Sequence, residues 1–510
     1  MSLAIIFSRA STGIQAPLVT VETHIAKGMR NFLIVGLPET AVKESRDRVR
    51  SALLNSEFEF PRGRITVNLA PADVPKEGGR FDLPIALGIL AASGQIPLEK
   101  LSYYEFTGEL ALTGELRPVR GVLPIALGAK KSGRLLIVPA GNAAEAALVQ
   151  DNEFLQAKHL LEVCAYLKGT QDLAVCERKT PKNITKATLD LADVRGQLHA
   201  KRALEIAAAG KHSLLLIGPP GTGKTMLASR IPSILPPLNE AQALEVAAVV
   251  SMSQKGFDAE VWQQLPYRAP HHTASSIALV GGGRPPKPGE ISLAHQGVLF
   301  LDELPEFNRH VLECLREPLE SGAITISRAA HQMIFPAQFQ LLAAMNPCPC
   351  GHAGNRWQTC YCSEEKIARY LGKLSAPLLD RIDMQIEVPA LEPDVLSDRA
   401  ENETSLTVLA RVLIAREQQY QRQQKCNADL TVKELERFCH LDTAATRLLT
   451  QVMQQFHFSA RVYHRIIKVA QTLADLTRSD QINAEHISEA MTFRSLDKAK
   501  IVYNEHSGKN

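Results

Sequence analysis

Cysteine, tryptophan and long hydrophobic runs are all scarce in this sequence. Only 9 of the 510 residues are cysteine, 2 are tryptophan, and aromatic residues make up 5%. Four cysteines form one cluster and the other five are scattered, so no disulfide framework is indicated. We expect reduced thiols in a cytoplasmic protein. Apolar runs such as residues 213–217 and 298–301 are far shorter than the roughly 20 residues of a membrane helix. The start, MSLAIIFSRAS, lacks the basic region of a signal peptide.

An excess of charge of either sign is also missing. The 57 Lys and Arg residues nearly balance the 54 Asp and Glu residues, which leaves a net charge of +3. This balance neither demands nor excludes nucleic acid, because a local basic patch can bind phosphates without a basic chain. Any nucleic-acid contact must therefore come from particular loops. At 510 residues the chain is too long for one hydrophobic core, so we expect two or three domains.

Composition and periodicity divide the chain into four segments. They are 1–170, a polar linker at 171–186, 187–390 and 391–510. The first mixes strands such as RITVNLAP with a helix predicted over residues 40–55, and the third alternates strands and helices. The last is helical, with helix starts at Thr431 and Asn483. We expect an α/β fold: a parallel-sheet core covered on both faces, an N-terminal α+β domain and a C-terminal helical lid.

The strongest motif is a phosphate-binding loop. A predicted strand at residues 213–217 leads into GPPGTGKT and then into a helical pattern, which is the strand–loop–helix context of a P-loop. The loop consists of Gly218, Pro219, Pro220, Gly221, Thr222, Gly223, Lys224 and Thr225. Its glycines let backbone amides approach phosphate oxygens at the positive end of the following helix. We expect Lys224 to neutralise β/γ-phosphate charge and Thr225 to ligate Mg²⁺, with ATP as the nucleotide.

Two later strands end in polar residues that suit the same site. The apolar run VLFL is followed by Asp302 and Glu303, and a third strand at residues 339–345 ends at Asn346. Asp302 is placed to hold Mg²⁺, directly or through water, and Glu303 to polarise the attacking water. The Asn346 amide could position that water near the γ-phosphate. Without the P-loop, paired acids and an Asn-Pro step would indicate only solvated turns.

Together these motifs resemble the AAA+ ATPases, and more narrowly their magnesium-chelatase-like branch. The resemblance implies that Arg381, in APLLDRID, is an arginine finger that reaches into the site of a neighbouring subunit. It also implies that Arg461, in SAR at the start of a helix, is the second sensor, and that residues 193–197 (DVRGQ) flank the adenine. A structural salt bridge is the alternative for each arginine. An arginine finger that acts in trans implies a ring, a hexamer in this class.

Insertions mark the narrower branch. The first contains RAPHHTASS, whose His271 and His272 we expect to be a loop pair rather than a metal site. Another reads as strand–turn–strand just before the third strand. In ring ATPases of this branch such hairpins point into the central channel, so Arg328 and His331 at the turn are candidates for contacting a nucleic-acid backbone. An ordinary solvated hairpin tip is the alternative.

Four of the nine cysteines gather just after Asn346. They are Cys348, Cys350, Cys360 and Cys362, two Cys-x-Cys pairs separated by nine residues. Four thiolates satisfy tetrahedral Zn²⁺, and this loop is long enough to bring the pairs together, although the usual zinc knuckle has two residues between its cysteines. We expect a structural zinc that braces the loop after Asn346. Reduced thiols and a redox switch are the alternatives.

The whole chain resembles the family of the ComM competence protein, also described as the YifB or magnesium-chelatase-like family. The resemblance is carried by NFLIVGLP, PKEGGRFDLP, the P-loop, RAPHHTAS, AHQGVLFLDELPEF and the DRID segment. It implies a homo-hexameric, ATP-driven DNA helicase that acts on single-stranded and branched DNA. Such a helicase promotes branch migration and extends the heteroduplex as incoming DNA is recombined during natural transformation. A recombinase and other DNA-uptake proteins are the implied partners, and no membrane is involved.

The N-terminal segment also resembles the Lon protease domain, which has the ribosomal S5-like fold. Lon carries its serine nucleophile in PKDGPSAG, whereas PKEGGRFD here has Arg80 at the serine position, and Leu123 or a close neighbour takes the place of Lon's lysine. Without a nucleophile and its base there is no acyl-enzyme chemistry, so we expect no protease activity. We expect a DNA-binding or assembly collar instead. Candidate arginines, interleaved with acids as on a solvated face, are Arg46, Arg50, Arg62 and Arg64.

Two other functions fit parts of the sequence. A chelatase-like or protein-remodelling motor that does not act on DNA has the same ATPase motifs, but nothing resembles a porphyrin site and the Asp-x-Ser-x-Ser motif of an integrin-like partner domain is absent. A scaffold that binds nucleotide without hydrolysing it is disfavoured by the intact acidic pair. A DNA motor is the leading hypothesis, and salt-sensitive DNA binding would separate it from the others.

Overall fold

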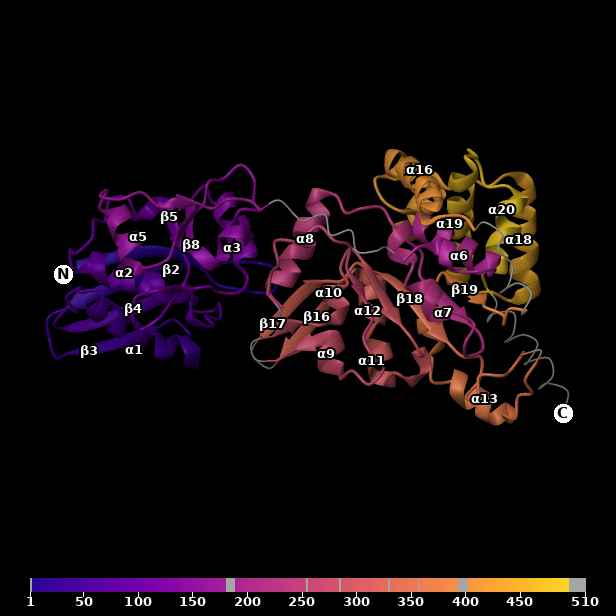
Figure 1. The fold of residues 1–510 in the computed structure, drawn as a ribbon, viewed down its shortest axis with the longest axis horizontal. Helices are drawn as coiled ribbons and strands as arrows, with labels where there is room; N and C mark the ends of the chain where they lie inside the picture. The colour runs from indigo at the N-terminus through magenta and orange to yellow at the C-terminus, as the bar shows by residue number, and fades with distance from the viewer. Residues whose placement is uncertain are drawn as a thin grey trace.

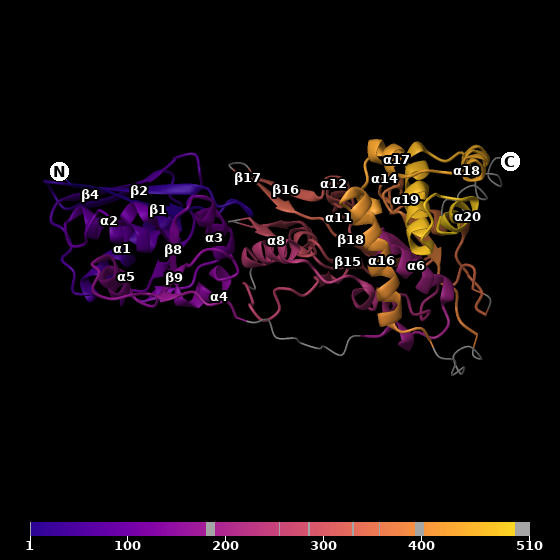
Figure 2. The same ribbon diagram turned by 90° about the horizontal axis from the view of Figure 1, so that it is seen from above.

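The computed structural model describes residues 2–179, 189–253, 256–283, 286–328, 331–355, 357–392 and 402–494. Figures 1 and 2 show an elongated molecule with an N-terminal domain at one end and a parallel-sheet domain beside it. The C-terminal helices pack against the far side of that sheet domain. Within the described residues, no helix is both long and apolar enough to cross a membrane.

The N-terminal domain is built on an eight-stranded mixed sheet with the order β10-β9-β8-β5-β1-β2-β4-β3. Its strands are β1 (Ser2–Arg9), β2 (Leu18–Ala26), β3 (Asn31–Val35), β4 (Arg64–Ala70), β5 (Tyr104–Phe106), β8 (Leu135–Pro139), β9 (Leu155–Ala157) and β10 (Ala174–Val175), with a small ribbon of β6 (Glu109–Leu110) and β7 (Leu116–Arg117). Its helices are α1 (Thr40–Asn55), α2 (Asp82–Ala92), α3 (Val122–Lys131), α4 (Ala143–Ala146) and α5 (Leu160–Leu167). Every residue of α2 is buried, so this helix forms the centre of the core, against β1 and β2. The predicted helix over residues 40–55 is confirmed as α1.

The middle domain contains a five-stranded parallel sheet with the order β12-β15-β18-β11-β19. Its strands are β11 (Leu214–Ile217), β12 (Tyr267–Arg268), β15 (Val298–Leu301), β18 (Gln340–Met345) and β19 (Met384–Glu387). Its helices are α6 (Leu198–Gly210), α7 (Lys224–Ala228), α8 (Glu240–Ser251), α9 (Ser276–Val280), α10 (Glu290–Leu293), α11 (Arg309–Cys314), α12 (Arg316–Ser321), α13 (Glu364–Leu371) and α14 (Ala376–Leu379). Two short ribbons are β13 (Gly281–Gly282) with β14 (Lys287–Pro288), and β16 (Ala323–Arg328) with β17 (His331–Pro336).

Both faces of this sheet are covered, because alternate side chains of β11 pack into two different apolar cores. Leu214 and Leu216 belong to an apolar core that includes α6 and the C-terminal helices, whereas Leu215 and Ile217 belong to a second core with α11 and the β16–β17 hairpin. All four side chains are buried. A strand buried on both faces reads as a continuous apolar run, which is why LLLI shows no alternation in sequence. The expected parallel-sheet α/β fold is confirmed.

The C-terminal region is helical. Its helices are α16 (Ser405–Gln423), α17 (Val432–Phe438), α18 (Thr443–Phe456), α19 (Ala460–Thr477) and α20 (Ala484–Thr492). Thr431 and Asn483 are N-caps, and each forms a reciprocal capping box with the residue three positions later. Both helix starts expected from the sequence are therefore confirmed.

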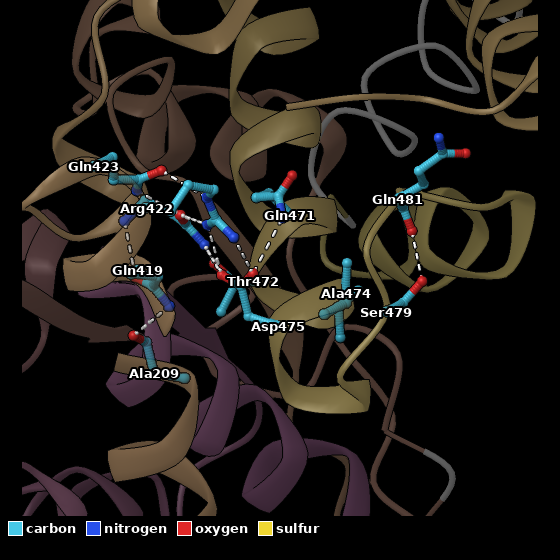
Figure 3. Close-up of polar contacts among 12 residues, drawn as sticks. Ala209, Gln419, Arg422, Gln423, Gln471, Thr472, Ala474, Asp475, Ser479 and Gln481 are labelled. Atoms are coloured by element: carbon cyan, nitrogen blue, oxygen red, sulfur yellow. Dashed lines mark hydrogen bonds and ion pairs between the residues drawn. The ribbon is translucent and has the colours of Figure 1, made fainter. Parts of the chain in front are cut away.

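A buried polar network fixes the C-terminal helices to one another and to α6 (Figure 3). Arg422 on α16 donates two hydrogen bonds, at 2.7 and 3.0 Å, to the buried carboxylate of Asp475 on α19. Gln471 donates to the same carboxylate at 3.1 Å, and Gln419 donates to the carbonyl of Ala209 on α6 at 3.2 Å. Because a buried charge is costly without partners, this pairing selects one arrangement of the helices.

The N-terminal domain is joined to the middle domain through α8. Ser251, at the end of α8, donates to the buried carboxylate of Glu145, which also accepts from the Leu123 amide at 2.9 Å. Burial raises the pKa of Glu145. Around this contact, Trp262 and residues of α3, β8 and α8 form one apolar cluster. The two domains therefore share a packed interface in addition to the connecting chain.

Candidate nucleotide site

The P-loop leaves β11 at the carboxyl edge of the sheet and enters α7. Gly221 and Gly223 have φ angles of +79° and +86°, which side chains rarely adopt, so both positions require glycine. The Lys224 ammonium lies inside the loop and donates to the carbonyl oxygens of Gly218 at 2.7 Å and Pro219 at 2.8 Å. Burial lowers the pKa of Lys224, and the charges of the two acids after β15 oppose this shift.

The expected Mg²⁺ ligands lie together. The Thr225 hydroxyl donates to a carboxylate oxygen of Asp302 at 2.6 Å. Thr225 is the second residue of α7 and Asp302 follows β15, so the contact joins two residues that are 77 positions apart in the sequence. One hydroxyl and one carboxylate at a phosphate-binding loop match the oxygen ligands that Mg²⁺ takes beside a nucleotide. These residues fit the ion.

Asn346 reaches the same loop from the intervening strand. It follows β18, which lies between β15 and β11 in the sheet, and its side-chain oxygen accepts from Lys224 Nζ at 3.2 Å. Carboxyl ends of parallel strands meet at one edge, so the P-loop, the acidic pair and this amide converge there. The structure brings together all the site residues expected from the three strands.

Glu303 has a partner that the sequence reasoning missed. It adopts φ +53°, and one of its carboxylate oxygens lies 3.0 Å from His272 Nδ1, a distance that makes an ion pair when the histidine is protonated. We expected His271 and His272 to form a loop pair, and the two rings do lie 4.2 Å apart, but His272 also lies beside the expected catalytic carboxylate. The only signal in the sequence was the two adjacent histidines of RAPHH.

The DVRGQ stretch supports the P-loop from the other side. Gln197 begins α6 with φ +52°. Its side-chain amide donates to the Pro389 carbonyl at 2.8 Å and to the Thr222 carbonyl at 3.3 Å. The residue before α6 thus links the P-loop to the segment that follows β19.

Arg381 lies at the opposite edge of the sheet from the P-loop. It comes just before β19, whose first residue, Met384, pairs with Leu214, the first residue of the parallel strand β11. The P-loop follows the last residue of β11, so the length of that strand, roughly 13 Å, separates the two features. Arg381 is therefore placed away from the nucleotide site of its own chain.

An acidic residue of α12 holds this arginine. The Arg381 side chain is only 6% exposed and donates to the carboxylate of Glu320. The hydrogen bond from Arg381 is the main cause that lowers the pKa of Glu320, and the nearby charge of Arg461 adds to it. Arg461 itself is exposed in the first turn of α19. Both arginines implied by the family thus lie beside Glu320, a residue that no sequence motif marked.

The four clustered cysteines form one group. Their sulfur atoms all lie within 4.8 Å of one another, and three of the separations are 3.3, 3.5 and 3.7 Å. Tetrahedral zinc with Zn–S bonds of about 2.3 Å places its sulfurs about 3.8 Å apart. The cluster of Cys348, Cys350, Cys360 and Cys362 is therefore compatible with zinc.

The cysteine loop packs directly on the P-loop. Gly351 has φ +84°, and a Cβ atom there would lie 2.6 Å from the Pro220 ring. Beside this contact is a cavity of about 320 Å³, which is lined by Gly218, Pro219, Ala353, Trp357 and Pro389 among others. A metal that holds the cysteine loop would therefore brace the P-loop as well as the segment after Asn346.

The hairpin expected before the third strand is confirmed as β16–β17, with Arg328 and His331 as its last paired residues. The side chains of Arg328 and His331 lie outside the described residues. Their predicted contact with nucleic acid therefore stays a prediction.

The sheet and the site together define the class. A P-loop strand and an acidic strand are separated by the strand that carries Asn346, and a C-terminal helical domain packs behind them. This is the arrangement of an AAA+ ATPase.

Comparison with known proteins gives the family. Family models described as "Magnesium chelatase, subunit ChlI", "Subunit ChlI of Mg-chelatase" and "Magnesium chelatase, subunit ChlI C-terminal" match residues 190–396, 21–142 and 402–494. The chain is 54% identical over 502 residues to "Competence protein ComM" of Haemophilus influenzae, which covers 97% of this chain and 98% of that protein. It is 51% identical over 505 residues to "Uncharacterized protein YifB" of Escherichia coli, which covers 98% and 99%. The chain belongs to this ComM and YifB family of magnesium-chelatase-like AAA+ proteins.

A partial similarity to Lon proteases is also found. "Lon protease 2" of Thermus thermophilus is 26% identical over 165 residues, which is 30% of this chain and 20% of that protein. Arg80, which we expect at the position of Lon's serine, and Leu123, which we expect at or next to that of its lysine, are both buried in the N-terminal domain. Neither residue can act as a hydroxyl nucleophile or its base.

Proposed function

We propose that this chain is a ring-shaped, ATP-driven DNA motor: a hexameric helicase that promotes branch migration and extends heteroduplex while incoming DNA is recombined in natural transformation. The observation that carries the proposal is the placement of the P-loop and Arg381 at opposite edges of one sheet. A site completed by an arginine of a neighbour requires head-to-tail contacts, which form a ring when the rotation between subunits closes. A relative named as a competence protein supports DNA as the polymer on which the ring acts.

Within each site the residues have separate tasks. Lys224 stabilises the negative charge of the β- and γ-phosphates, and Thr225 with Asp302 would hold Mg²⁺, which neutralises further phosphate charge when bound. Glu303 polarises the attacking water and accepts its proton. His272, whose Nδ1 lies 3.0 Å from Glu303, would hold the carboxylate in place when protonated.

Asn346 connects the nucleotide to the rest of the chain. Because its oxygen already accepts from Lys224, a change at the γ-phosphate is transmitted to the segment that begins the cysteine loop. We propose that the four cysteines hold a structural zinc, so that this segment moves as one body with the P-loop it contacts.

The proposed arginine finger, Arg381, is paired with Glu320 of its own chain. We propose that Arg381 exchanges the Glu320 carboxylate for the γ-phosphate of the neighbouring subunit, since a phosphate accepts from the guanidinium fork as a carboxylate does. Arg461, beside the same carboxylate, serves the same neighbouring site. DNA then contacts the tips of the β16–β17 hairpins through Arg328 and His331.

The test is ATP-dependent branch migration on a labelled three-stranded DNA by the wild type and by Lys224→Ala. We expect the wild type to move the branch and Lys224→Ala to leave it in place, because the variant lacks the phosphate-binding ammonium. Lys366→Ala, an exposed lysine on α13, is the matched control and should behave as the wild type. A wild type that hydrolyses ATP but moves no branch would replace the DNA motor with the alternative of a chelatase-like or protein-remodelling motor.

A further inference from the structure

The N-terminal domain has a groove at its outer end that the ATPase mechanism does not use. It lies where the start of β3, the helix α1 and the turn before β4 come together, and its volume is about 810 Å³. Figure 1 shows β3 and α1 at the end of the molecule away from the middle domain. The β3 strand is also the edge strand of the eight-stranded sheet. The groove is therefore accessible from outside the molecule.

The groove is basic, and most of its arginines lack an acidic partner. It is lined by Arg30, Arg46, Arg50 and Arg62, against two acidic residues, Asp47 and Glu59. Only Arg46 pairs with an acid, Asp47 at 3.6 Å, and both of these side chains are more than half exposed, so this ion pair is weak. Within the described residues, no carboxylate lies within 4.0 Å of the other three guanidinium groups. Unpaired cations around one groove favour an anionic ligand.

Two aromatic rings, which also pack against the apolar core of the domain, line the same groove. Phe32 and Phe60 are half-buried, and their ring centroids are 6.1 Å apart with an angle of 49° between the planes. The guanidinium carbon of Arg50 lies 5.6 Å from the centroid of the Phe60 ring. A small inorganic anion would not stack on these rings. Unstacked bases stack on aromatic side chains and on guanidinium planes, while their phosphates contact arginines.

We propose that this groove binds single-stranded DNA. The arginines contact the phosphates and the rings of Phe32 and Phe60 take the bases, so recognition is by charge and stacking and does not depend on sequence. The inference rests on the proposed DNA motor for its choice of DNA, and adds a second contact, far from the nucleotide site, through which each subunit holds a displaced strand. Of the four arginines predicted for the collar, the inference excludes Arg64, because it does not line the groove.

The first test measures binding of the full-length protein to a fluorescein-labelled oligothymidylate of about 20 nucleotides, by anisotropy and without ATP. Arg50→Glu/Arg62→Glu is compared with Lys100→Glu/Lys131→Glu, which makes the same charge change at exposed sites outside the groove. We expect the groove variant to bind at least about tenfold more weakly, with a salt slope smaller by about 1.4 for two lost phosphate contacts. The control should keep the wild-type slope.

A second variant addresses the rings without changing the charge. Phe60→Leu keeps an apolar side chain in place but removes the stacking surface, so we expect about tenfold weaker binding with an unchanged salt slope. This variant keeps the inference testable if the charge reversal unfolds the domain, which circular dichroism would show. Equal binding by Phe60→Leu and the wild type overturns the inference, as does tighter binding of an oligouridylate of the same length than of the DNA.

The outcome is separable from that of the branch-migration test. The binding measurement needs no hydrolysis, so weaker binding by the groove variants supports the groove even where no branch moves. Branch migration by the wild type, with equal oligonucleotide binding by the groove and control variants, overturns the groove and leaves the motor intact.

Discussion

At the scale of single residues, the two glutamates after β15 have different surroundings although they are three positions apart. Glu303 lies 3.0 Å from His272 and next to Asp302, whereas Glu306 pairs with Lys373 at 3.2 Å on the surface. The proposed mechanism assigns a role to Glu303 alone, and Glu306 provides a control of the same residue type.

We expect Glu303→Gln to bind ATP but to hydrolyse it about 10²–10⁴-fold more slowly, because an amide keeps the shape but cannot accept the proton of water. Phosphate release and nucleotide binding measure the two properties separately. Glu306→Gln should hydrolyse ATP at the wild-type rate. Normal hydrolysis by Glu303→Gln would remove Glu303 from its role.

A further glutamate, Glu77, has an unusual pKa. Glu77, next to Arg80 in the N-terminal domain, has its pKa raised to about 7, chiefly by burial and also by the charge of Glu39, while Arg80 opposes the shift. Because the folded state binds this proton more tightly than the unfolded chain, its contribution to stability is complete below about pH 4.5 and is lost as the pH rises to about 7.

Glu77→Gln should therefore gain stability relative to the wild type as the pH rises. We expect the difference in the free energy of unfolding between the two proteins to move by about 1–2 kcal/mol between pH 5 and pH 8, after allowance for partial exposure of the group. Thermal unfolding at both values measures it, with the exposed Glu115→Gln as control. The same difference in the free energy of unfolding at both pH values would contradict the raised pKa of Glu77.

At the scale of elements, the loop between β18 and α13 connects the Asn346 strand to the P-loop. The loop carries the four clustered cysteines, and its Gly351 touches Pro220. It has little regular structure of its own, so its shape depends on what links the two Cys-x-Cys pairs. Zinc would supply that link with four bonds.

We expect about one zinc per chain, and Cys350→Ser should lower this content and weaken ATP binding, because a looser loop no longer supports the P-loop. Elemental analysis and a nucleotide-binding assay measure both effects. Cys314→Ser, a half-buried cysteine outside the cluster, should change neither. A zinc-free preparation with full activity would favour plain reduced thiols.

At the scale of the whole molecule, the nucleotide site and Arg381 occupy opposite edges of the same sheet. A molecule with the two halves of a site on different faces can complete the site only by stacking head to tail. A buried polar network also links α16 to α19 and to α6, so the C-terminal helices are attached to the sheet domain.

Mixing Arg381→Ala with Lys224→Ala subunits should therefore restore part of the hydrolysis that each variant lacks alone. An intact P-loop of one subunit would meet an intact arginine of the next in some of the mixed contacts. Arg447→Ala, an exposed arginine on α18, should lose no activity by itself. A mixture as inactive as its components would favour a structural role for the Arg381–Glu320 pair.

Much of the nucleotide site could be predicted from contiguous residues. The P-loop, the acidic pair and Asn346 each follow an apolar strand directly, and the carboxyl ends of parallel strands meet at one edge, so their convergence follows from local patterns. The capping boxes at Thr431 and Asn483 are local in the same way.

Contacts between side chains distant in sequence were decided only by the tertiary structure. Glu320 meets Arg381 across 61 residues and His272 meets Glu303 across the sheet edge, and no periodicity encodes either partner. The grouping of Arg30, Arg50 and Arg62 around two phenylalanines depends on how β3, α1 and the turn before β4 pack. Local sequence determines the backbone element and the residue at its end, whereas the side chain it meets depends on packing the whole domain.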